Sequence, residues 1–447
     1  MTIYKNPKFF FTDINNENFY GLINPFNKNG VKIITKEQHS FLNLFEDNIN
    51  LDVLSSISGY QVETITKMVN LFSKIGVLSF NSNFNSLEKN NSFKFDNIKK
   101  ISFWIHITDT CNLRCTYCYI STKETFNTME DKTLKQLEIK LIELKKKYPN
   151  IEHMTLKLSG GEVFSKFSFW KDKILKIKKN LKQHNLGVRI VCLTNMTILN
   201  DEVIKFLIDE DIGLGISLDG FEEYNSSRVF VNGKNSFETV KRNLLKLKEN
   251  NISFGIMTVV SNKNLNGLVN LTKFLIENKL SFRFSDVKGE NLDKIKFQKI
   301  LEECYKLMED NIGNDFSFKH QFKLSDLNIN SPSEKVCSMG TSGAAVYLDG
   351  SIYFCHTHFG VKEPIGSLFD EKNDLLEAIH KGNKYLGELS EECDECMYKL
   401  ICAGACPVYR VNGKSPECEL FKQTIPHIYN VLAKERLHNL KKLKGYI

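Results

Sequence analysis

The stretch Cys111-Asn-Leu-Arg-Cys115-Thr-Tyr-Cys118 decides how this chain is organised. Three cysteines separated by three and two residues place three thiols on one short loop. A [4Fe–4S] cluster normally takes four thiolates, so three leave one iron open to another ligand. The loop follows residues 101–108, an apolar and β-branched run that predicts a strand. A zinc loop or three unrelated buried thiols is the alternative interpretation.

Length and composition describe a large globular protein. With 447 residues and 42% hydrophobic content, the chain can bury a core of two to four domains. No apolar run approaches the roughly 20 residues of a membrane span, and no signal-peptide core follows Met1. We therefore expect a cytoplasmic protein with no membrane partner. Twelve cysteines in a reducing compartment favour metal or redox sites over disulfides. The net charge of +7 is explained by solvated helix faces.

Residues 1–80 predict a small winged-helix-like domain. Three short β-like runs come first, and a helix then begins at a capping box formed by Thr35 and Gln38. A second helix begins near Gln61, with apolar residues at helical spacing. That helix has no basic stripe, so we expect no nucleic-acid partner. Residues 81–100 are rich in Asn, Ser and Lys and predict a linker.

Residues 101–312 alternate between strand-like and amphipathic helical runs. Counting the strand before the cysteine loop, the pattern gives six βα units, which predicts an α/β fold with an open, partial (β/α)6 barrel. Functional residues of such barrels lie at the carboxyl ends of the strands. The predicted strands are 101–108, 154–158, 188–193, 213–218, 253–260 and 280–284.

With Tyr117 directly before its last cysteine, the loop resembles the signature of the radical S-adenosylmethionine (SAM) enzymes. The resemblance implies that Cys111, Cys115 and Cys118 hold a [4Fe–4S] cluster. It further implies that the open iron chelates SAM and that Tyr117 contacts the adenine. One electron from the cluster then cleaves SAM to a 5′-deoxyadenosyl radical, so the cofactors supply the hard chemistry.

Two further motifs resemble SAM-binding positions of this family. Gly160, Gly161 and Glu162 match its Gly-Gly-Glu motif, whose glycines allow a close backbone approach and whose glutamate accepts from the methionyl ammonium. Asn195 ends the third strand, and Met196 follows where the family usually has glycine.

The fourth strand leads into the remaining predicted contacts. Ser217 and Asp219 resemble ribose-binding positions, and Arg228 stands where the family places an arginine on the SAM carboxylate. Tyr224 and Asn225 occupy the positions of a frequent His-Asp pair. No catalytic residue of the chain itself is assigned.

Residues 313–447 carry seven cysteines that resemble the SPASM pattern, a C-terminal domain with auxiliary iron–sulfur clusters. The resemblance implies two such clusters, hence three [4Fe–4S] clusters in all. A zinc ribbon is the alternative. The first set is Cys393, Cys396, Cys402 and Cys418, and the second is Cys337, Cys355 and Cys406.

The second set has only three thiols, and residues 324–336 contain no further cysteine. Its open position could take a substrate thiolate, or His356 or His358 could close it. Cys192 and Cys304 are interpreted as buried hydrophobic residues.

In its layout the chain resembles the thioether-forming (sactipeptide-type) maturases of ribosomally made peptides. This resemblance implies a precursor peptide whose leader is bound by residues 1–80, and a flavodoxin- or ferredoxin-type electron donor. The alternatives are a maturase that forms a carbon–carbon or carbon–oxygen crosslink, a sulfatase-maturing-type enzyme, and a non-catalytic iron–sulfur sensor.

Overall fold

The structure is a computed structural model that describes residues 1–16, 18–27, 30–82, 84, 97–120, 127–372 and 374–445. A ten-stranded sheet with the order β13-β12-β11-β10-β9-β8-β7-β14-β15-β16 forms its centre. All six predicted parallel strands are present in this sheet, adjacent and in chain order. They are β7 (Lys100–Thr108), β8 (His153–Gly160), β9 (Gly187–Thr194), β10 (Gly213–Ser217), β11 (Phe254–Val260) and β12 (Ser281–Asp286).

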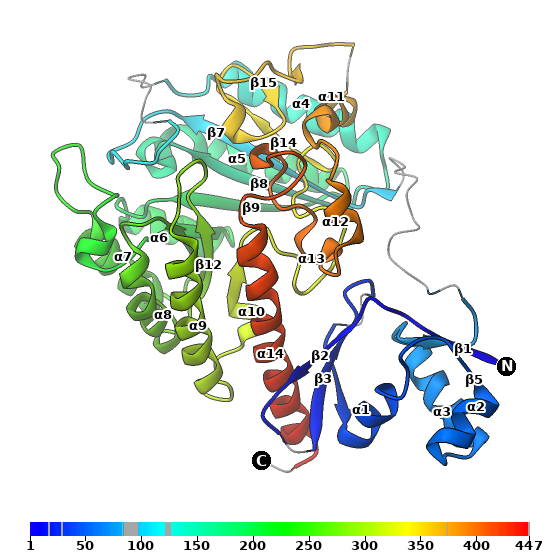
Figure 1. Cartoon of the computed structure of the whole chain (residues 1–447). Coiled ribbons are helices and arrows are strands. Elements are labelled where there is room, and N and C mark those ends of the chain that lie inside the picture. Colours follow the sequence, from blue (N-terminus) through cyan, green and yellow to red (C-terminus); the bar gives the residue numbers. More distant parts are fainter. Residues whose placement is uncertain are drawn as a thin grey trace.

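Helices cover one face of the parallel sheet (Figure 1). Alternate strand residues such as Phe103, Leu156 and Ile216 share one hydrophobic core with helix residues such as Trp170 and Leu271. The other residues of each strand point to the opposite side of the sheet, which we call the lumen face. The covering helices are α4 (Asp131–Lys147), α5 (Phe167–Gln183), α6 (Asp201–Asp209), α7 (Phe237–Glu249), α8 (Leu268–Glu277) and α9 (Lys294–Asp310).

The sheet extends beyond the six strands on both sides. β13 (Phe322–Leu324) pairs in parallel with β12, and β14 (Gly343–Val346) pairs in parallel with β7. β15 (Ser351–Tyr353) and β16 (Gly366–Ser367) then add as antiparallel strands. These strands are too short to show a hydrophobic period, so the sequence did not predict them. Residues on both sides of the proposed boundary at 312/313 thus contribute to one continuous sheet.

The N-terminal part contains two small sheets and three helices. β2 (Phe10–Asp13), β3 (Phe19–Ile23) and β4 (Lys32–Thr35) form an antiparallel sheet, followed by α1 (Lys36–Leu42), which begins at the predicted capping box. A second sheet, with the order β5-β1-β6, was not predicted because its strands have four residues or fewer. Its strands and the remaining helices are β1 (Thr2–Lys5), β5 (Ile49–Asn50), β6 (Leu78–Ser79), α2 (Leu51–Ser58) and α3 (Val62–Ser73).

The β2–β3–β4 sheet packs against the long C-terminal helix α14 (Cys418–Leu443), which runs from the cysteine-rich part down to this sheet (Figure 1). Asn430 of α14 donates from Nδ2 to Oγ1 of Thr12 at 2.9 Å. The ring of Phe10 meets the rings of Tyr398 and Tyr429 edge-on, with centroids 5.6 and 5.7 Å apart. The N-terminal part is therefore docked on the C-terminal part.

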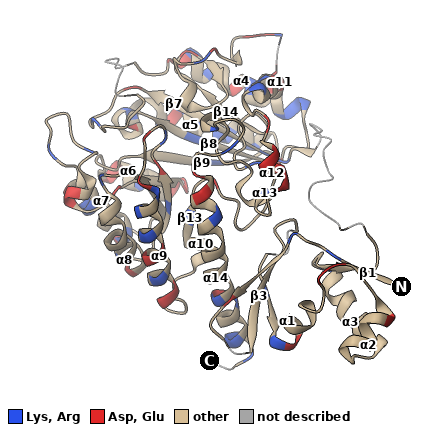
Figure 2. Ribbon diagram, viewed as in Figure 1, with Lys and Arg blue, Asp and Glu red and all other residues tan. Residues whose placement is uncertain are grey.

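Most of the predicted linker, residues 85–96, lies outside the described residues. Basic and acidic residues are interspersed over the outer helices (Figure 2), as expected for solvated helix faces. In the described part of the chain, no helix is long and apolar enough to cross a membrane.

Candidate functional site

The loop 111–118 leaves the carboxyl end of β7 and is fixed by backbone hydrogen bonds. The amides of Arg114 and Thr116 donate to the carbonyls of Val229 and Ser227 at 2.7 and 3.0 Å. Cys111 lies within electrostatic range of Cys115 and Cys118, and burial raises the pKa of the Cys111 thiol to about 11. Three converging thiols of this kind become ligands when a metal compensates the thiolate charge, so the donor set fits an iron–sulfur cluster.

The predicted Gly-Gly-Glu motif is joined to the residues that lead into this loop. The amides of Gly161 and Glu162 donate to the carbonyls of Thr108 and Thr110 at 2.7 and 2.8 Å. A Cβ on Gly160 would lie 2.2 Å from the Thr108 oxygen, and one on Gly161 would lie 2.3 Å from the Thr110 oxygen. In this structure the glycines therefore permit a close approach to the chain's own backbone, which positions the cysteine loop.

Glu162 is fully buried and ties two strand ends together. Its carboxylate accepts from Oγ1 of Thr194 and the amide of Asn195, both at 2.7 Å, and from the amide of Phe164 at 3.0 Å. Burial raises the pKa of Glu162, and these three donors oppose that effect. A carboxylate has about four lone-pair sites, so roughly one remains for a ligand ammonium.

Asn195 faces the cysteine loop. Its Nδ2 donates to Oδ1 of Asn112 at 3.1 Å and lies 3.8 Å from Sγ of Cys111. Met196 has a φ of +53°, a left-handed conformation that favours glycine. The chain thus keeps at this turn a backbone shape suited to the family's glycine.

Tyr117, Asp219 and Arg228 form a hydrogen-bonded chain beside the loop. The Tyr117 hydroxyl donates to Oδ2 of Asp219 at 2.5 Å, and Nη1 of Arg228 donates to the same hydroxyl at 2.7 Å. Burial raises the pKa of the Asp219 carboxyl, and the Arg228 charge opposes the rise. Arg228 also lies within electrostatic range of Cys115. The structure therefore brings these three predicted residues together at the cysteine loop, while Ser217 ends β10 nearby in sequence.

Two residues that sequence reasoning did not assign support this arrangement. Asn225 is fully buried, and its Oδ1 accepts from the backbone amide of Asp219 at 3.2 Å. Asp109, two residues before the first cysteine, contacts Nε2 of His106 at 2.8 Å and accepts from the Tyr347 hydroxyl at 3.1 Å. The Tyr347 contact joins the C-terminal part to the start of the loop, and no local pattern could have indicated it.

The C-terminal thiols assemble in the two predicted sets. Cys402 lies within electrostatic range of Cys393, Cys396 and Cys418, and burial raises its pKa to about 12. In the other set, Cys355 lies within electrostatic range of both Cys337 and Cys406. Both donor sets fit iron–sulfur ligation by type, and the first set also has the four thiols that a cluster normally takes.

Arg410, which the sequence did not single out, holds the turn between Cys402 and Cys406. Its guanidinium donates to the carbonyls of Ala403, Gly404 and Leu386 at 2.7, 2.9 and 2.8 Å. Ala403 and Ala405 both have positive φ, so this turn adopts a conformation unusual for residues other than glycine. The arginine therefore helps to fix one thiol from each set.

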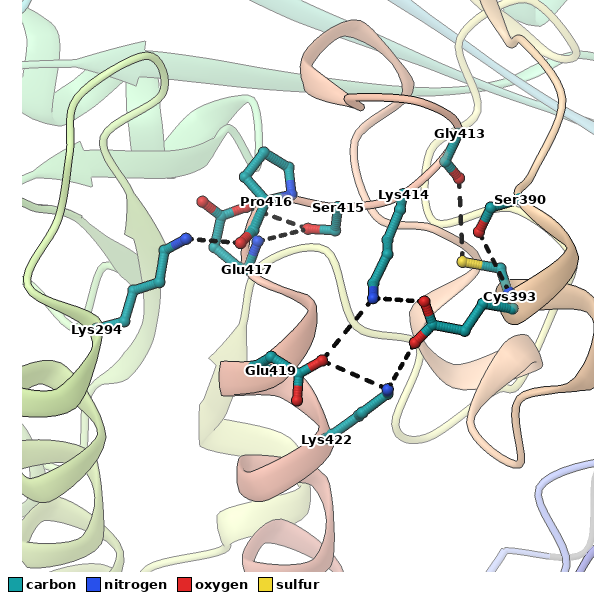
Figure 3. Close-up of polar contacts among 11 residues, drawn as sticks. Lys294, Ser390, Cys393, Gly413, Lys414, Ser415, Pro416, Glu417, Glu419 and Lys422 are labelled. Atoms are coloured by element: carbon teal, nitrogen blue, oxygen red, sulfur yellow. Dashed lines mark hydrogen bonds and ion pairs between the residues drawn. The ribbon is translucent and has the colours of Figure 1, made fainter.

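A network of charged side chains lies beside Cys393 of the four-thiol set (Figure 3). Glu392 accepts from Lys414 at 2.7 Å and from Lys422 at 2.9 Å. Three residues that could in principle bind a metal ion also meet here: the ligand atoms of Glu392, Cys418 and Glu419 all lie within 4.8 Å of one another. In the described part of the chain this is the one group of histidine, cysteine, aspartate or glutamate residues that is so close together. Both carboxylates are ion-paired with lysines, so this group is a salt-bridge network.

The two histidines after Cys355 have different surroundings. Nδ1 of His356 lies 3.6 Å from Sγ of Cys355, and its ring stacks on Trp104 with centroids 4.0 Å apart. His358 is buried against Tyr385, with centroids 4.7 Å apart. His356 is thus the better placed of the two for the open position. Two other cysteines, Cys192 and Cys304, are fully buried in the barrel core, as predicted.

Residues 105–275 match the Radical SAM superfamily. This stretch of the chain is therefore similar to a radical SAM domain. The family implies a [4Fe–4S] cluster and SAM as cofactors, in agreement with the donor set of the loop 111–118.

Relatives and solved structures match longer parts of the chain than residues 105–275. A cysteine-type anaerobic sulfatase-maturating enzyme of Clostridium perfringens is 22% identical over 72% of this chain and 95% of its own length. The structure of the sulfatase maturase anSMEcpe with bound AdoMet and a Cp18Cys peptide has a TM-score of 0.61, with 20% identity, and covers 74% of this chain and 98% of that one. Streptococcus suis SuiB bound to the precursor peptide SuiA has a TM-score of 0.52, with 18% identity, over 93% and 98% of the two chains. The chain is thus similar to sulfatase-maturating enzymes in sequence and to anSMEcpe and SuiB in fold, and it matches the Radical SAM superfamily over residues 105–275.

Proposed function

We propose that the protein is a peptide maturase that uses SAM to form a thioether crosslink in a ribosomally made precursor peptide. The observation that carries this proposal is the extent of the structural match. The likeness to SuiB, crystallised with its precursor peptide, covers 93% of the chain, whereas the likeness to the sulfatase maturase covers 74%. The longer match supports a fold shared with SuiB across most of residues 1–80 as well.

In this proposal, residues 1–80 form a winged-helix-like domain that binds the leader. β4 is an edge strand of its sheet, to which an extended peptide can add. A groove of about 400 Å³ lies between the start of this strand, α10 (Phe318–Gln321) and α14, and Lys32, Lys319 and Arg436 are among its lining residues. The groove gives a bound leader both a strand edge and charged side chains.

The chain's own residues would bind and orient the cofactors at the carboxyl end of the barrel. Cys111, Cys115 and Cys118 would hold the first cluster, and Glu162, Asn195, Asp219 and Arg228 would bind SAM. When bound, these cofactors supply a 5′-deoxyadenosyl radical that removes one hydrogen atom from the peptide. The seven C-terminal cysteines would hold two auxiliary clusters in a SPASM domain.

Thioether formation removes one hydrogen atom, one proton and one electron from the peptide. One peptide carbon loses a hydrogen atom to the adenosyl radical, and a peptide cysteine loses its S–H proton. The carbon–sulfur bond forms as one electron passes to an acceptor of the iron–sulfur class. The three-thiol set around Cys355 favours this chemistry, because its thiols number one fewer than a cluster normally takes. A carbon–carbon or carbon–oxygen crosslink remains the alternative within the same class.

A sulfatase-maturing activity is the second candidate. It is favoured by the curated relatives of that activity, one of which matches over 95% of its own length. The two activities differ in substrate, because a sulfatase maturase would act on a sulfatase peptide without the leader-binding part of this chain.

The deciding experiment incubates the purified, reconstituted enzyme with small cysteine-containing peptides encoded beside its gene. Mass spectrometry should show a loss of about 2 mass units per crosslink, the two hydrogens removed from C–H and S–H. Replacing the acceptor cysteine by serine should stop crosslinking while 5′-deoxyadenosine still forms. A cysteine-free peptide that is crosslinked normally would shift the chemistry to carbon–carbon or carbon–oxygen bonds. Turnover of a sulfatase peptide alone would establish the second candidate.

A further inference from the structure

The lumen face of the barrel carries cations without matching acids. Because side chains alternate along a strand, the residues opposite the helix-packed ones share this face. Among the described residues, strands β7 to β13 place no aspartate or glutamate on it. Its basic residues are Lys100, Lys157, Arg189, Arg283 and Lys323.

Lys157 and Arg283 lie close enough to repel each other. Burial lowers the pKa of Lys157, Cys337 opposes this effect, and the Arg283 charge lowers the pKa further. Within the described ranges, the Lys157 ammonium has no hydrogen bond or ion pair, and the guanidinium of Arg283 makes a single weak contact, from Nη2 to Sδ of Met257 at 3.5 Å. Asp326 lies within electrostatic range of Arg283, but its carboxylate is paired with Lys288 at 2.7 Å.

The walls around this pair belong to the proposed substrate site. Trp104 is the residue opposite Lys157 on the neighbouring strand, and His356 stacks on Trp104 beside Cys355. Both cations lie within electrostatic range of His356. The indole N–H of Trp104 is itself buried without an acceptor among the described residues. This part of the lumen therefore offers several hydrogen-bond donors, and among the described residues no aspartate or glutamate pairs with Lys157 or Arg283, although the Cys337 thiol lies within electrostatic range of Lys157.

We propose that Lys157 and Arg283 bind a carboxylate side chain of the peptide segment that is modified, so that the substrate is acidic close to its reacting residue. This inference rests on the proposed peptide substrate and deepens it. The planar guanidinium on β12 can bind both oxygens of a carboxylate, while the ammonium on β8 adds a point charge. Arg283 is exposed and Lys157 is half-buried, so both charges can be reached by a ligand that enters the lumen.

The test uses the reconstituted holoenzyme under anaerobic conditions and three fluorescent glycine-serine peptides. The peptides are identical except that they carry three glutamates, three glutamines or three lysines. The glutamate peptide should bind about tenfold more tightly than the glutamine peptide at low salt, and the lysine peptide should bind most weakly. Added salt should reduce the difference, because screening weakens charge pairs.

Variants locate the charge preference. In Lys157→Gln/Arg283→Gln the glutamate-to-glutamine ratio should fall to within about twofold, a difference below 1 kcal/mol on the affinity scale. Lys157→Glu/Arg283→Glu should favour the lysine peptide. The matched control, Lys205→Gln/Arg242→Gln, removes one lysine and one arginine from outer helices α6 and α7 and should keep the wild-type ratio.

Several outcomes would overturn the inference. Equal binding of the glutamate and glutamine peptides to wild-type enzyme does so without any variant, as does failure of all three peptides to bind. A preference that survives in Lys157→Gln/Arg283→Gln and disappears in the control places the charge recognition outside the lumen. If Lys157→Gln/Arg283→Gln changes the spectrum of the auxiliary cluster but keeps the wild-type ratio of glutamate to glutamine peptide binding, Lys157 acts on Cys337 and not on the peptide. Cys337 lies within electrostatic range of Lys157. Each of these results leaves the crosslinking test of the precursor peptide unaffected.

Discussion

The loop 111–118 and the C-terminal cysteines are two thiol-rich regions that are built in opposite ways. All three thiols of the loop lie within residues 111–118, shortly after β7. Hydrogen bonds to the backbone of neighbouring segments hold the loop in place. In the C-terminal part, one set draws Cys337, Cys355 and Cys406 from separate segments of the sequence, and the other lies within residues 393–418. The first site is therefore a local structure placed by a strand, whereas the others exist only once the C-terminal part has folded.

The charges beside the two regions also differ. Arg228, next to the loop, is buried and bonded to Tyr117. Lys414 and Lys422, next to the four-thiol set, are partly exposed, at 29% and 37% of their side-chain surface, and are paired with Glu392. A buried cation is not solvated by water, so it depends on hydrogen bonds and ion pairs from the protein. Ion pairs that reach the solvent are screened by water and salt. Five variants can sharpen or break this comparison.

Replacing Cys111, Cys115 and Cys118 together by alanine should abolish SAM cleavage, because it removes the three proposed ligands of the cluster that supplies the electron. If the C-terminal sets fold independently of the loop, iron should fall from about twelve to about eight atoms per chain, one [4Fe–4S] cluster less. Iron analysis and 5′-deoxyadenosine assays measure both effects. Stoichiometric zinc with little iron in wild-type protein would refute the cluster assignment of both regions.

Cys402→Ala and Cys406→Ala should separate the two C-terminal sets, although the residues share the turn held by Arg410. Each variant should lose about four irons. Cys406→Ala should also remove the effect of added precursor peptide on the auxiliary-cluster spectrum, while Cys402→Ala should retain it. If both variants lose the same spectroscopic component, the thiols form one site and the division into two sets is wrong.

Arg228→Lys should raise the SAM concentration needed for half-maximal cleavage by about ten- to a hundredfold, since lysine cannot keep both the Tyr117 bond and a ligand carboxylate. Iron content should stay at the wild-type value. The control is Arg242→Lys on the exposed face of α7. An unchanged SAM dependence in Arg228→Lys would limit this arginine to a structural role beside Cys115.

Lys422→Gln should have the smallest effect, leaving iron content and SAM cleavage near wild type because its ion pairs are exposed. Hydrogen bonds from Lys414 and Lys422 lower the pKa of Glu392 to about 2. Any stability from this network is present at neutral pH and is lost as the pH falls below the usual glutamate range toward 2. Thermal melts of both proteins between neutral pH and pH 3 check this. A large loss of iron at neutral pH would show that these exposed charges matter as much as buried Arg228.

Much of the barrel could be predicted from the sequence because its signals are local. Six strands and the helices between them have regular hydrophobic periods, and Cys111, Cys115 and Cys118 stand at a fixed spacing. The capping box at Thr35 is likewise complete within four residues. The grouping of the seven C-terminal cysteines came from a resemblance, since their spacing alone also allowed a zinc ribbon.

Only the tertiary structure decided features that join distant segments. The strands β13 and β14 are too short to show a period, and pairing with β12 and β7 alone places them in the sheet. The docking of Phe10 on α14 and the bond from Tyr347 to Asp109 link residues hundreds of positions apart. The unpaired charges of Lys157 and Arg283 likewise meet only because separate strands face one lumen. Sequence patterns record which face a residue takes within its own element, and packing between elements determines what that residue meets there.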